Sequence, residues 1–148
     1  MEHLDKKILN MIQHEFPLDP KPFEILGTKA GIDEDHILER IRNLKESGIV
    51  RRIGAVLDTG VLGFASTLCA AKVPVDMLDK FVSIVNSYEG VTHNYLRDNE
   101  YNVWFTLIAP TGEGIEKLLS DISKETDITD IITMSVKRRF KVDARFKL

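Results

Sequence analysis

The order of segment types after Gly63 constrains the fold of this chain more than any other feature of its sequence. Apolar runs of strand length alternate with stretches whose apolar residues recur at helical spacing. The order is strand, helix, strand, strand, helix, strand, which predicts two helices covering one face of a four-stranded antiparallel sheet. The predicted segments are 66–73, 76–88, 91–97, 101–109, 113–125 and 128–140.

The first fifty residues carry a different pattern, in which helix-breaking residues separate three short helices. Two prolines stop the first helix, and Gly31 and Gly48 follow the second and third at positions that suit helix ends. A tight Ala-Gly turn before the last helix is typical of a helix-turn-helix. We therefore predict an α+β chain: a winged-helix-like helix-turn-helix domain at 1–50, a strand linker at 51–63 and a ferredoxin-like βαββαβ domain at 64–148.

Composition excludes several classes of protein. The 148 residues are 43% hydrophobic and 29% charged, which fits a folded globular protein and excludes a disordered or collagen-like chain. No apolar run approaches the ~20 residues of a membrane helix, and the N-terminus lacks the apolar core of a signal peptide, so we expect a cytoplasmic protein without a membrane span. The single cysteine, Cys69, lies in an apolar strand and is expected in the core.

Several local phrases resemble one family of regulators. The sequence reads LDKKIL at 4–9, RIRNLKESGIV at 40–50 and LDTGVLG at 57–63. Together with the predicted architecture, these phrases resemble the Lrp/AsnC family of transcription regulators across essentially the whole chain. Because the uncovered face of the predicted sheet carries many apolar residues, we also expect a partner chain to bury it.

The helix-turn-helix departs from a DNA-binding one in its charge. The first fifty residues hold seven Lys and Arg against ten Asp and Glu, and the third helix opens with DED at 33–35. Nonspecific DNA affinity comes mostly from Lys and Arg, so we predict poor binding to duplex DNA. The alternative is that these acids complement the helix dipole while Arg40, Arg42, Arg51 and Arg52 hold DNA.

The second domain departs from the regulators too. They commonly carry a Thr-Gly-x-x-Asp phrase between the two middle strands, whereas this chain has no glycine there and reads VTHNYLRDNEYNVWFTL at 91–107. This phrase, with RRIGA at 51–55, resembles the siroheme decarboxylases, enzyme relatives of Lrp/AsnC. The resemblance implies removal of CO2 from two acetate arms of siroheme, in the siroheme-dependent route to heme or toward heme d1. It further implies paired paralogous subunits, as a heterodimer or higher assembly, and no cofactor beyond the iron tetrapyrrole substrate.

A strand phrase with a histidine supplies the candidate catalytic residues. Period-two alternation predicts that Val91, His93, Tyr95 and Arg97 share one face of their strand. His93 is the first candidate for the acid that protonates the carbon left by CO2, since histidine exchanges protons near neutral pH. Tyr95 is the second catalytic candidate. His93 is alternatively a ligand of the siroheme iron, and the sequence does not distinguish these roles.

Cationic and aromatic residues supply the candidate substrate contacts. Arginine suits carboxylates because its planar fork bonds both oxygens, and the candidates are Arg51, Arg52, Arg97, Lys137, Arg138 and Arg139. In a strand over 128–140, Lys137 and Arg139 point one way and Arg138 the other, so only part of this run can line one pocket; the alternative is a solvated, charge-protected edge strand. Trp104 and Phe105 point to opposite faces, and we place Trp104 nearer the ligand or partner.

The sequence is also compatible with two other functions. One is a DNA-binding Lrp/AsnC-type regulator whose sheet domain senses a small molecule or heme. The other is an inactive chain that only supports a catalytic paralogue. Salt-dependent DNA binding distinguishes the first from an enzyme.

Overall fold

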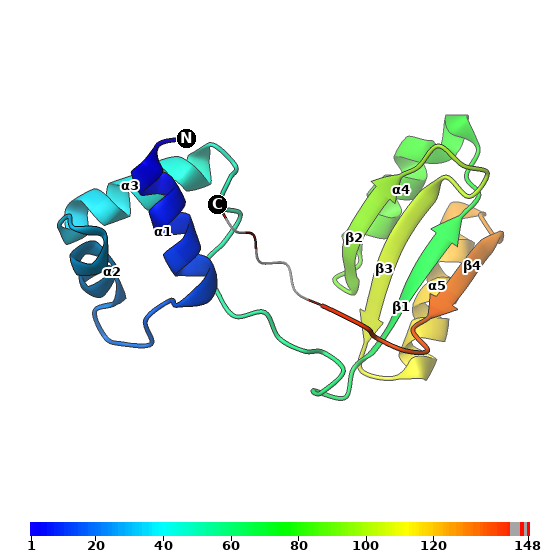
Figure 1. The fold of residues 1–148 in the computed structure, drawn as a ribbon. Helices are drawn as coiled ribbons and strands as arrows, with labels where there is room; N and C mark the ends of the chain where they lie inside the picture. Colours follow the sequence, from blue (N-terminus) through cyan, green and yellow to red (C-terminus); the bar gives the residue numbers. More distant parts are fainter. Residues whose placement is uncertain (143–145, 147) are drawn as a thin grey trace. The chain divides into compact units, whose positions relative to one another are not determined.

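A computed structural model describes residues 1–142, 146 and 148 of the chain. These residues form two compact units (Figure 1). The first contains Met1–Val56 together with the described residues of the C-terminal tail, and the second contains Leu57–Phe140. None of the helices in this part of the chain is long and apolar enough to cross a membrane.

Three helices make up most of the first unit, and their ends fall where the sequence predicts them. Pro22 occupies the first turn of the second helix, where its missing N–H costs no hydrogen bond. Gly31 and Gly48 adopt positive φ angles of 85° and 76°, a conformation that glycine accepts without strain. The helices are α1 (His3–His14), α2 (Pro22–Ala30) and α3 (Glu34–Glu46).

Apolar side chains from all three helices form the core of this unit. Ile8 of α1, Leu26 of α2 and both Ile37 and Ile41 of α3 are buried together. The spacing of Ile37 and Ile41 is one helical turn, as the sequence pattern requires for a buried helix face.

The C-terminal tail also contacts the first unit. The Asn10 side chain donates to the Leu148 carbonyl at 3.2 Å and accepts from the Leu148 N–H at 3.3 Å. The Phe146 N–H donates to the Gln13 side chain at 3.0 Å. The sequence-based division, which keeps residues 64–148 in one domain, does not anticipate these contacts with α1.

The linker differs from its prediction. All of residues 51–63 are described, and none of them belongs to a strand. The Asp58 side chain instead accepts hydrogen bonds from Gly60 N and Val61 N, at 3.0 and 3.3 Å, and forms a turn. An extended segment counts as a strand only when it pairs with another, and residues 51–57 pair with none of the residues that the structure describes. The predicted strand linker is therefore an irregular segment followed by a turn.

The second unit contains a four-stranded antiparallel sheet, as the order of segments predicts, and Figure 1 shows its helices α4 and α5 together on one side of it. The strands lie in the order β2, β3, β1, β4, which is the ferredoxin-like arrangement. In chain order the elements are β1 (Ala65–Ala71), the 3₁₀ helix η1 (Val75–Met77), α4 (Leu78–Ser87), β2 (Val91–Leu96), β3 (Val103–Ala109), α5 (Gly112–Thr126) and β4 (Ile131–Ser135).

Between the sheet and the two helices lies one apolar core. Phe105 of β3 packs edge-to-face against Phe81 of α4, with ring centroids 6.1 Å apart. Alternate residues of β3 are fully or nearly fully buried, which is the pattern of a central strand with one covered face. Cys69 lies in this core, as predicted, and burial raises the pKa of its thiol to about 12.

The last strand is shorter than its prediction. The sequence pattern favours a strand over 128–140, but β4 spans only Ile131–Ser135. Its pairing with β1 ends where Thr67 lies opposite Ser135. Residues 136–140 are exposed and belong to no strand in the described part of the chain. The basic run that follows Val136 therefore does not alternate between two faces of a sheet.

Candidate active site

An irregularity in β2 decides which of its side chains reach the open face of the sheet, by which we mean the face that α4 and α5 do not cover. Val91 lies opposite Leu107 of β3, whereas His93 lies opposite Thr106, so two residues of β2 advance against one of β3. This register shift is a β-bulge at Thr92.

The bulge separates Val91 from His93. Leu107 is fully buried, and Val91 packs against the same core. Neighbouring residues of β3 point to opposite faces, so His93, opposite Thr106, points to the open face. The prediction that Val91 shares a face with His93 is therefore wrong, because strict alternation assumes a strand without a bulge.

Three of the candidate side chains then follow one another on the open face. The rings of His93 and Tyr95 stack, with centroids 6.2 Å apart and planes 26° from parallel. The Arg97 guanidinium carbon lies 5.7 Å from the centre of the Tyr95 ring, within the range of a cation–π contact. Tyr95 is 51% exposed, so a ligand can reach this row. His93, Tyr95 and Arg97 therefore share one face of the sheet, as predicted.

Trp104 borders the same row from β3. It lies opposite Tyr95 in the strand register, on the open face, while its neighbour Phe105 is fully buried under the helices. The Trp104 indole N–H donates to the Tyr101 carbonyl at 2.6 Å, which fixes the orientation of the ring. The prediction that these two aromatic residues point to opposite faces is confirmed, and Phe105 is the one in the core.

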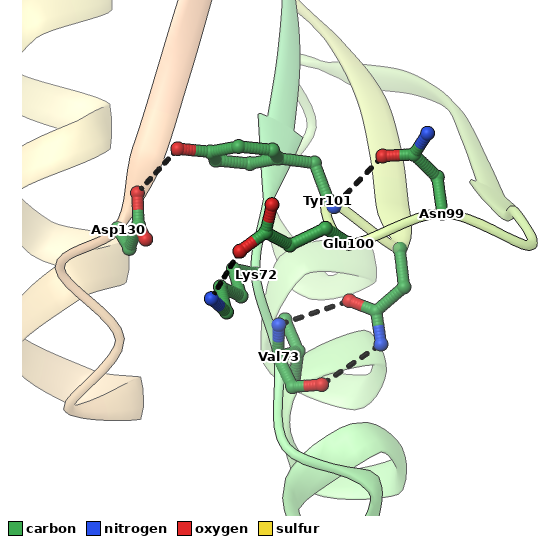
Figure 2. Close-up of polar contacts among 7 residues, drawn as sticks. Lys72, Val73, Asn99, Glu100, Tyr101 and Asp130 are labelled. Carbon is green, nitrogen blue, oxygen red and sulfur yellow. Dashed lines mark hydrogen bonds and ion pairs between the residues drawn. The ribbon is translucent and has the colours of Figure 1, made fainter.

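Polar side chains tie the turn between β2 and β3 to the neighbouring strands (Figure 2). The Tyr101 hydroxyl donates to Asp130, just before β4, at 2.9 Å, and this hydrogen bond raises the pKa of the Tyr101 phenol. Lys72, just after β1, forms an ion pair with Glu100, which raises the pKa of the lysine. Both contacts hold the turn against the strands on the far side of β3.

Asn102 connects this turn directly to the backbone. Its side-chain oxygen accepts from the Val73 N–H at 2.9 Å, and its amide nitrogen donates to the Val73 carbonyl at 2.8 Å. The Asn102 carbonyl in turn accepts from the Arg97 N–H at 2.7 Å. Asn102 thus anchors the turn that carries Arg97 and whose Tyr101 carbonyl orients Trp104.

The other predicted arginines lie elsewhere in the chain. Arg51 and Arg52 belong to the first unit, where they line a cavity of about 1040 Å³ whose walls are mainly apolar. His93, Tyr95, Arg97 and Trp104 belong to the second unit. The geometry within each unit therefore groups the candidates into two sets.

The C-terminal basic run has partners of its own. Arg139 donates to the Asp58 carboxylate at 3.0 Å. The pKa of Asp58 is lowered, first by the N–H of Val61 and also by Arg139. Arg138 lies over the Phe140 ring, 5.0 Å from its centre. Because Lys137, Arg138 and Arg139 follow β4 rather than belong to it, the prediction of their alternating directions does not apply.

In the first unit, the acidic start of α3 is a helix cap. The Asp33 carboxylate accepts from the His36 N–H at 2.9 Å and contacts the His36 ring nitrogen at 2.7 Å, and these bonds lower the pKa of Asp33. Arg40, a candidate for DNA contact, instead donates to Glu2 at 2.7 Å and to Asp5 at 3.2 Å. The unit thus neutralises this cation within itself.

Sequence reasoning missed two residues of this region, Thr92 and Asn102. Asn102 offered a weak signal, because it is a polar residue directly before a mostly apolar strand. Thr92 offered none, since a bulge depends on how two strands register and not on the residue alone.

Chemically, the open face offers a proton carrier, a phenol, a cation and an aromatic surface within one row. This set suits a flat, carboxylate-bearing ligand: the guanidinium binds carboxylate, the rings stack, and the imidazole moves a proton.

Comparison with known families covers both units. A family profile described as the siroheme decarboxylase NirDL-like HTH domain matches residues 5–51. A second profile, described as the AsnC-like ligand binding domain, matches residues 61–141.

Two curated proteins align with the whole chain. The siroheme decarboxylase alpha subunit of Oleidesulfovibrio alaskensis is 47% identical over 148 residues, which cover all of this chain and 90% of that protein. The alpha subunit of Desulfovibrio desulfuricans is 45% identical, and the match covers 85% of its length.

Solved structures also match the fold of this chain. The crystal structure of the siroheme decarboxylase NirDL matches 98% of this chain with a TM-score of 0.71 and 36% identity, although this chain spans only 47% of the NirDL chain. NirDL has also been solved with an iron-uroporphyrin III analogue. An AsnC family regulator from Agrobacterium tumefaciens has a TM-score of 0.77 at 20% identity over 99% of this chain and 96% of its own, which shows the shared fold alone. The full-length identity to two alpha subunits and the matching helix-turn-helix profile show that this chain belongs to the siroheme decarboxylase family.

Proposed function

We propose that this chain is the counterpart of the siroheme decarboxylase alpha subunit and removes CO2 from two acetate side chains of siroheme, giving didecarboxysiroheme for heme or heme d1 synthesis. The similarity to alpha subunits along all 148 residues carries this proposal. The row of His93, Tyr95 and Arg97 supports it, because it supplies the groups that such a reaction needs.

The reaction requires a proton but no electrons from outside. In each acetate arm, the bond between the methylene carbon and the carboxylate breaks, CO2 leaves, and the electron pair stays on the methylene carbon. The conjugated pyrrole system spreads this charge, and one proton then converts the carbon to a methyl group. The reaction therefore needs no redox cofactor, and the iron tetrapyrrole takes part as its substrate.

The residues of the open face divide these tasks. Arg97 binds a carboxylate of the macrocycle, and Tyr95 and Trp104 present rings on which it stacks. His93 delivers the proton, with the Tyr95 phenol beside it as the second proton-carrying group. In the alternative assignment, His93 binds the siroheme iron and Tyr95 supplies the proton.

Further cations complete carboxylate binding. Siroheme carries eight carboxylates, more than one arginine can hold. We assign additional contacts to Arg51 and Arg52 and to the run Lys137, Arg138 and Arg139. The competing assignment for the last three is that they are solvated surface residues without a role in substrate binding. At Arg139 the ion pair with Asp58 favours a role outside substrate binding.

A second subunit completes the enzyme. The open face carries exposed or half-exposed apolar side chains beside the row, among them Leu68, Ile132 and Met134. Such a surface is covered in a stable protein, and we assign its cover to a paralogous decarboxylase subunit in a heterodimer or larger assembly in the cytoplasm.

The test is anaerobic incubation of the purified chain with siroheme, alone and with its paralogous subunit, followed by mass spectrometry of the tetrapyrrole. We expect the pair to remove two CO2 units, a loss of about 88 Da. Conversion by the chain alone would show that the partner is dispensable. Intact siroheme in both reactions would contradict the proposed function.

A further inference from the structure

The bulge in β2 gives His93 a neighbour that a regular strand would not. In a regular strand Thr92 and His93 point to opposite faces, and their side chains cannot meet. At the bulge, two residues of β2 oppose one residue of β3, so the alternation fails at this step. The Thr92 hydroxyl oxygen accordingly lies 3.0 Å from Nδ1 of the His93 ring.

The surrounding contacts leave the other ring nitrogen for a ligand. Tyr95 stacks against the flat face of the imidazole, so it holds the ring plane without engaging a nitrogen. Asn94, the next residue of β2, donates to Asn86 of α4 at 2.9 Å and therefore lies on the helix side. Among the described residues, Thr92 is the one side chain that forms a hydrogen bond with the His93 ring.

We propose that Thr92 is a positioning residue that accepts a hydrogen bond from Nδ1–H of His93 and thereby presents Nε2 to siroheme. This inference rests on the proposed function for its catalytic meaning, but the tautomer it assigns is a property of the free chain. The two ring nitrogens of a histidine are distinct, and the partner of one decides which form the other takes.

The assignment serves either role of His93. As an acid, the imidazolium gives its Nε2 proton to the methylene carbon and becomes the neutral ring with its remaining proton on Nδ1, still bonded to Thr92. As an iron ligand, the neutral ring with Nδ1–H offers the Nε2 lone pair to the metal. In both cases the hydroxyl stabilises the form of the ring that the reaction needs.

The first test measures the tautomer without substrate. Two-bond ¹H–¹⁵N spectra of the ¹⁵N-histidine-labelled full chain, taken at a pH where imidazoles are neutral, report which nitrogen carries the proton, and the His93→Gln variant assigns the signal. We expect the Nδ1–H form in the wild type and in Thr92→Ser, and a shift to the Nε2–H form in Thr92→Val. His36, whose ring is held by Asp33 in the other unit, is the internal control and should not change.

A wild-type His93 in the Nε2–H form, or a spectrum that Thr92→Val leaves unchanged, would overturn the proposal. Neither result depends on whether the chain acts on siroheme, so failure of this inference is distinguishable from failure of the proposed function.

The second test measures turnover by the reconstituted pair. Removing a hydrogen-bonding partner behind a reactive or ligating histidine typically costs about tenfold to a hundredfold in activity. We expect Thr92→Val to lower kcat by this factor with KM unchanged, and Thr92→Ser to restore it, since serine keeps the hydroxyl. A general loss of structure would not be rescued in this way. An unchanged kcat, or a change confined to KM, would refute the positioning role even if the tautomer is as assigned.

Discussion

Charged and polar side chains have different surroundings in the first unit, which contains the helix-turn-helix, and in the second unit, which contains the sheet. In the first unit, Arg40 is held by Glu2 and Asp5, and Asp33 caps its own helix. In the second unit, a bulge turns His93 and Tyr95 away from the core and leaves them exposed on the open face. Arg40 and Asp33 thus complete the fold of the first unit, whereas we propose that His93 and Tyr95 of the second unit face a ligand.

This contrast is the basis of our proposal for where function lies in a fold that regulators share. The Agrobacterium tumefaciens regulator has the same fold at only 20% identity, so the fold alone does not decide between a regulator and an enzyme. We propose that a few side chains on the open face of the sheet and the acids at the start of α3 make the difference.

The largest effect that sharpens this comparison is expected from His93→Ala. A positioned general acid contributes about 10²–10⁴-fold to a rate, and we expect a loss in this range. Single-turnover conversion of siroheme by the reconstituted pair, followed by mass spectrometry, measures it. His36→Ala is the matched control from the other unit and should leave the rate unchanged. Equal rates for wild type and His93→Ala would remove His93 from the mechanism.

The next largest effect concerns the two faces of β3. Phe105 is fully buried against Phe81, so Phe105→Ala should lower the free energy of unfolding by about 3–5 kcal/mol. Urea denaturation followed by fluorescence measures this, because Trp104 is the single tryptophan of the chain and lies in the same strand. A loss below about 1 kcal/mol would mean that the covered face is not the core of this unit.

A smaller effect is expected at the turn beside the site. Asn102→Ala removes both hydrogen bonds to Val73 and leaves its N–H and carbonyl without these partners, which costs about 1–3 kcal/mol. Asn102→Asp keeps the acceptor for the Val73 N–H but loses the donor, so it should fall between Ala and wild type in the same denaturation assay. If Asp were no better than Ala, the paired contact with Val73 would not be what stabilises the turn.

The smallest expected effect is that of duplex DNA on the chain. With an acidic start to α3 and Arg40 held internally, binding at physiological salt should be weaker than the ~10⁻⁴ M limit of ordinary nonspecific binding. Fluorescence anisotropy of a labelled duplex over a salt series measures it. The double variant Glu34→Lys and Asp35→Lys should bind more tightly and with a steeper salt dependence. Tight, salt-dependent binding by the wild type would restore the regulator hypothesis.

Much of the fold was predictable because it depends on local signals. Proline and glycine lie at the helix ends of the first unit, and the buried residues of α3 and α5 recur at helical spacing, as the sequence pattern predicts. The half-buried Trp104 beside the buried Phe105 followed from the alternation of a regular strand. These features needed no knowledge of what lies next to them in space.

The errors arose where a partner strand decides the outcome. The bulge at Thr92, the early end of β4 at Ser135 and the irregular linker all depend on which residues pair across strands. That His93, Tyr95 and Arg97 lie on one face was predictable from the sequence. That this face is the open one depends on the bulge at Thr92, a residue without any catalytic signal in the sequence.

The central claim is that siroheme binds to the sheet and not to the helix-turn-helix. Hydrogen–deuterium exchange of the reconstituted pair tests it most directly, with and without siroheme under anaerobic conditions. Our account predicts slower exchange in peptides covering β2 and β3, with α3 unchanged. Slower exchange in α3, with β2 and β3 unaffected, would contradict it.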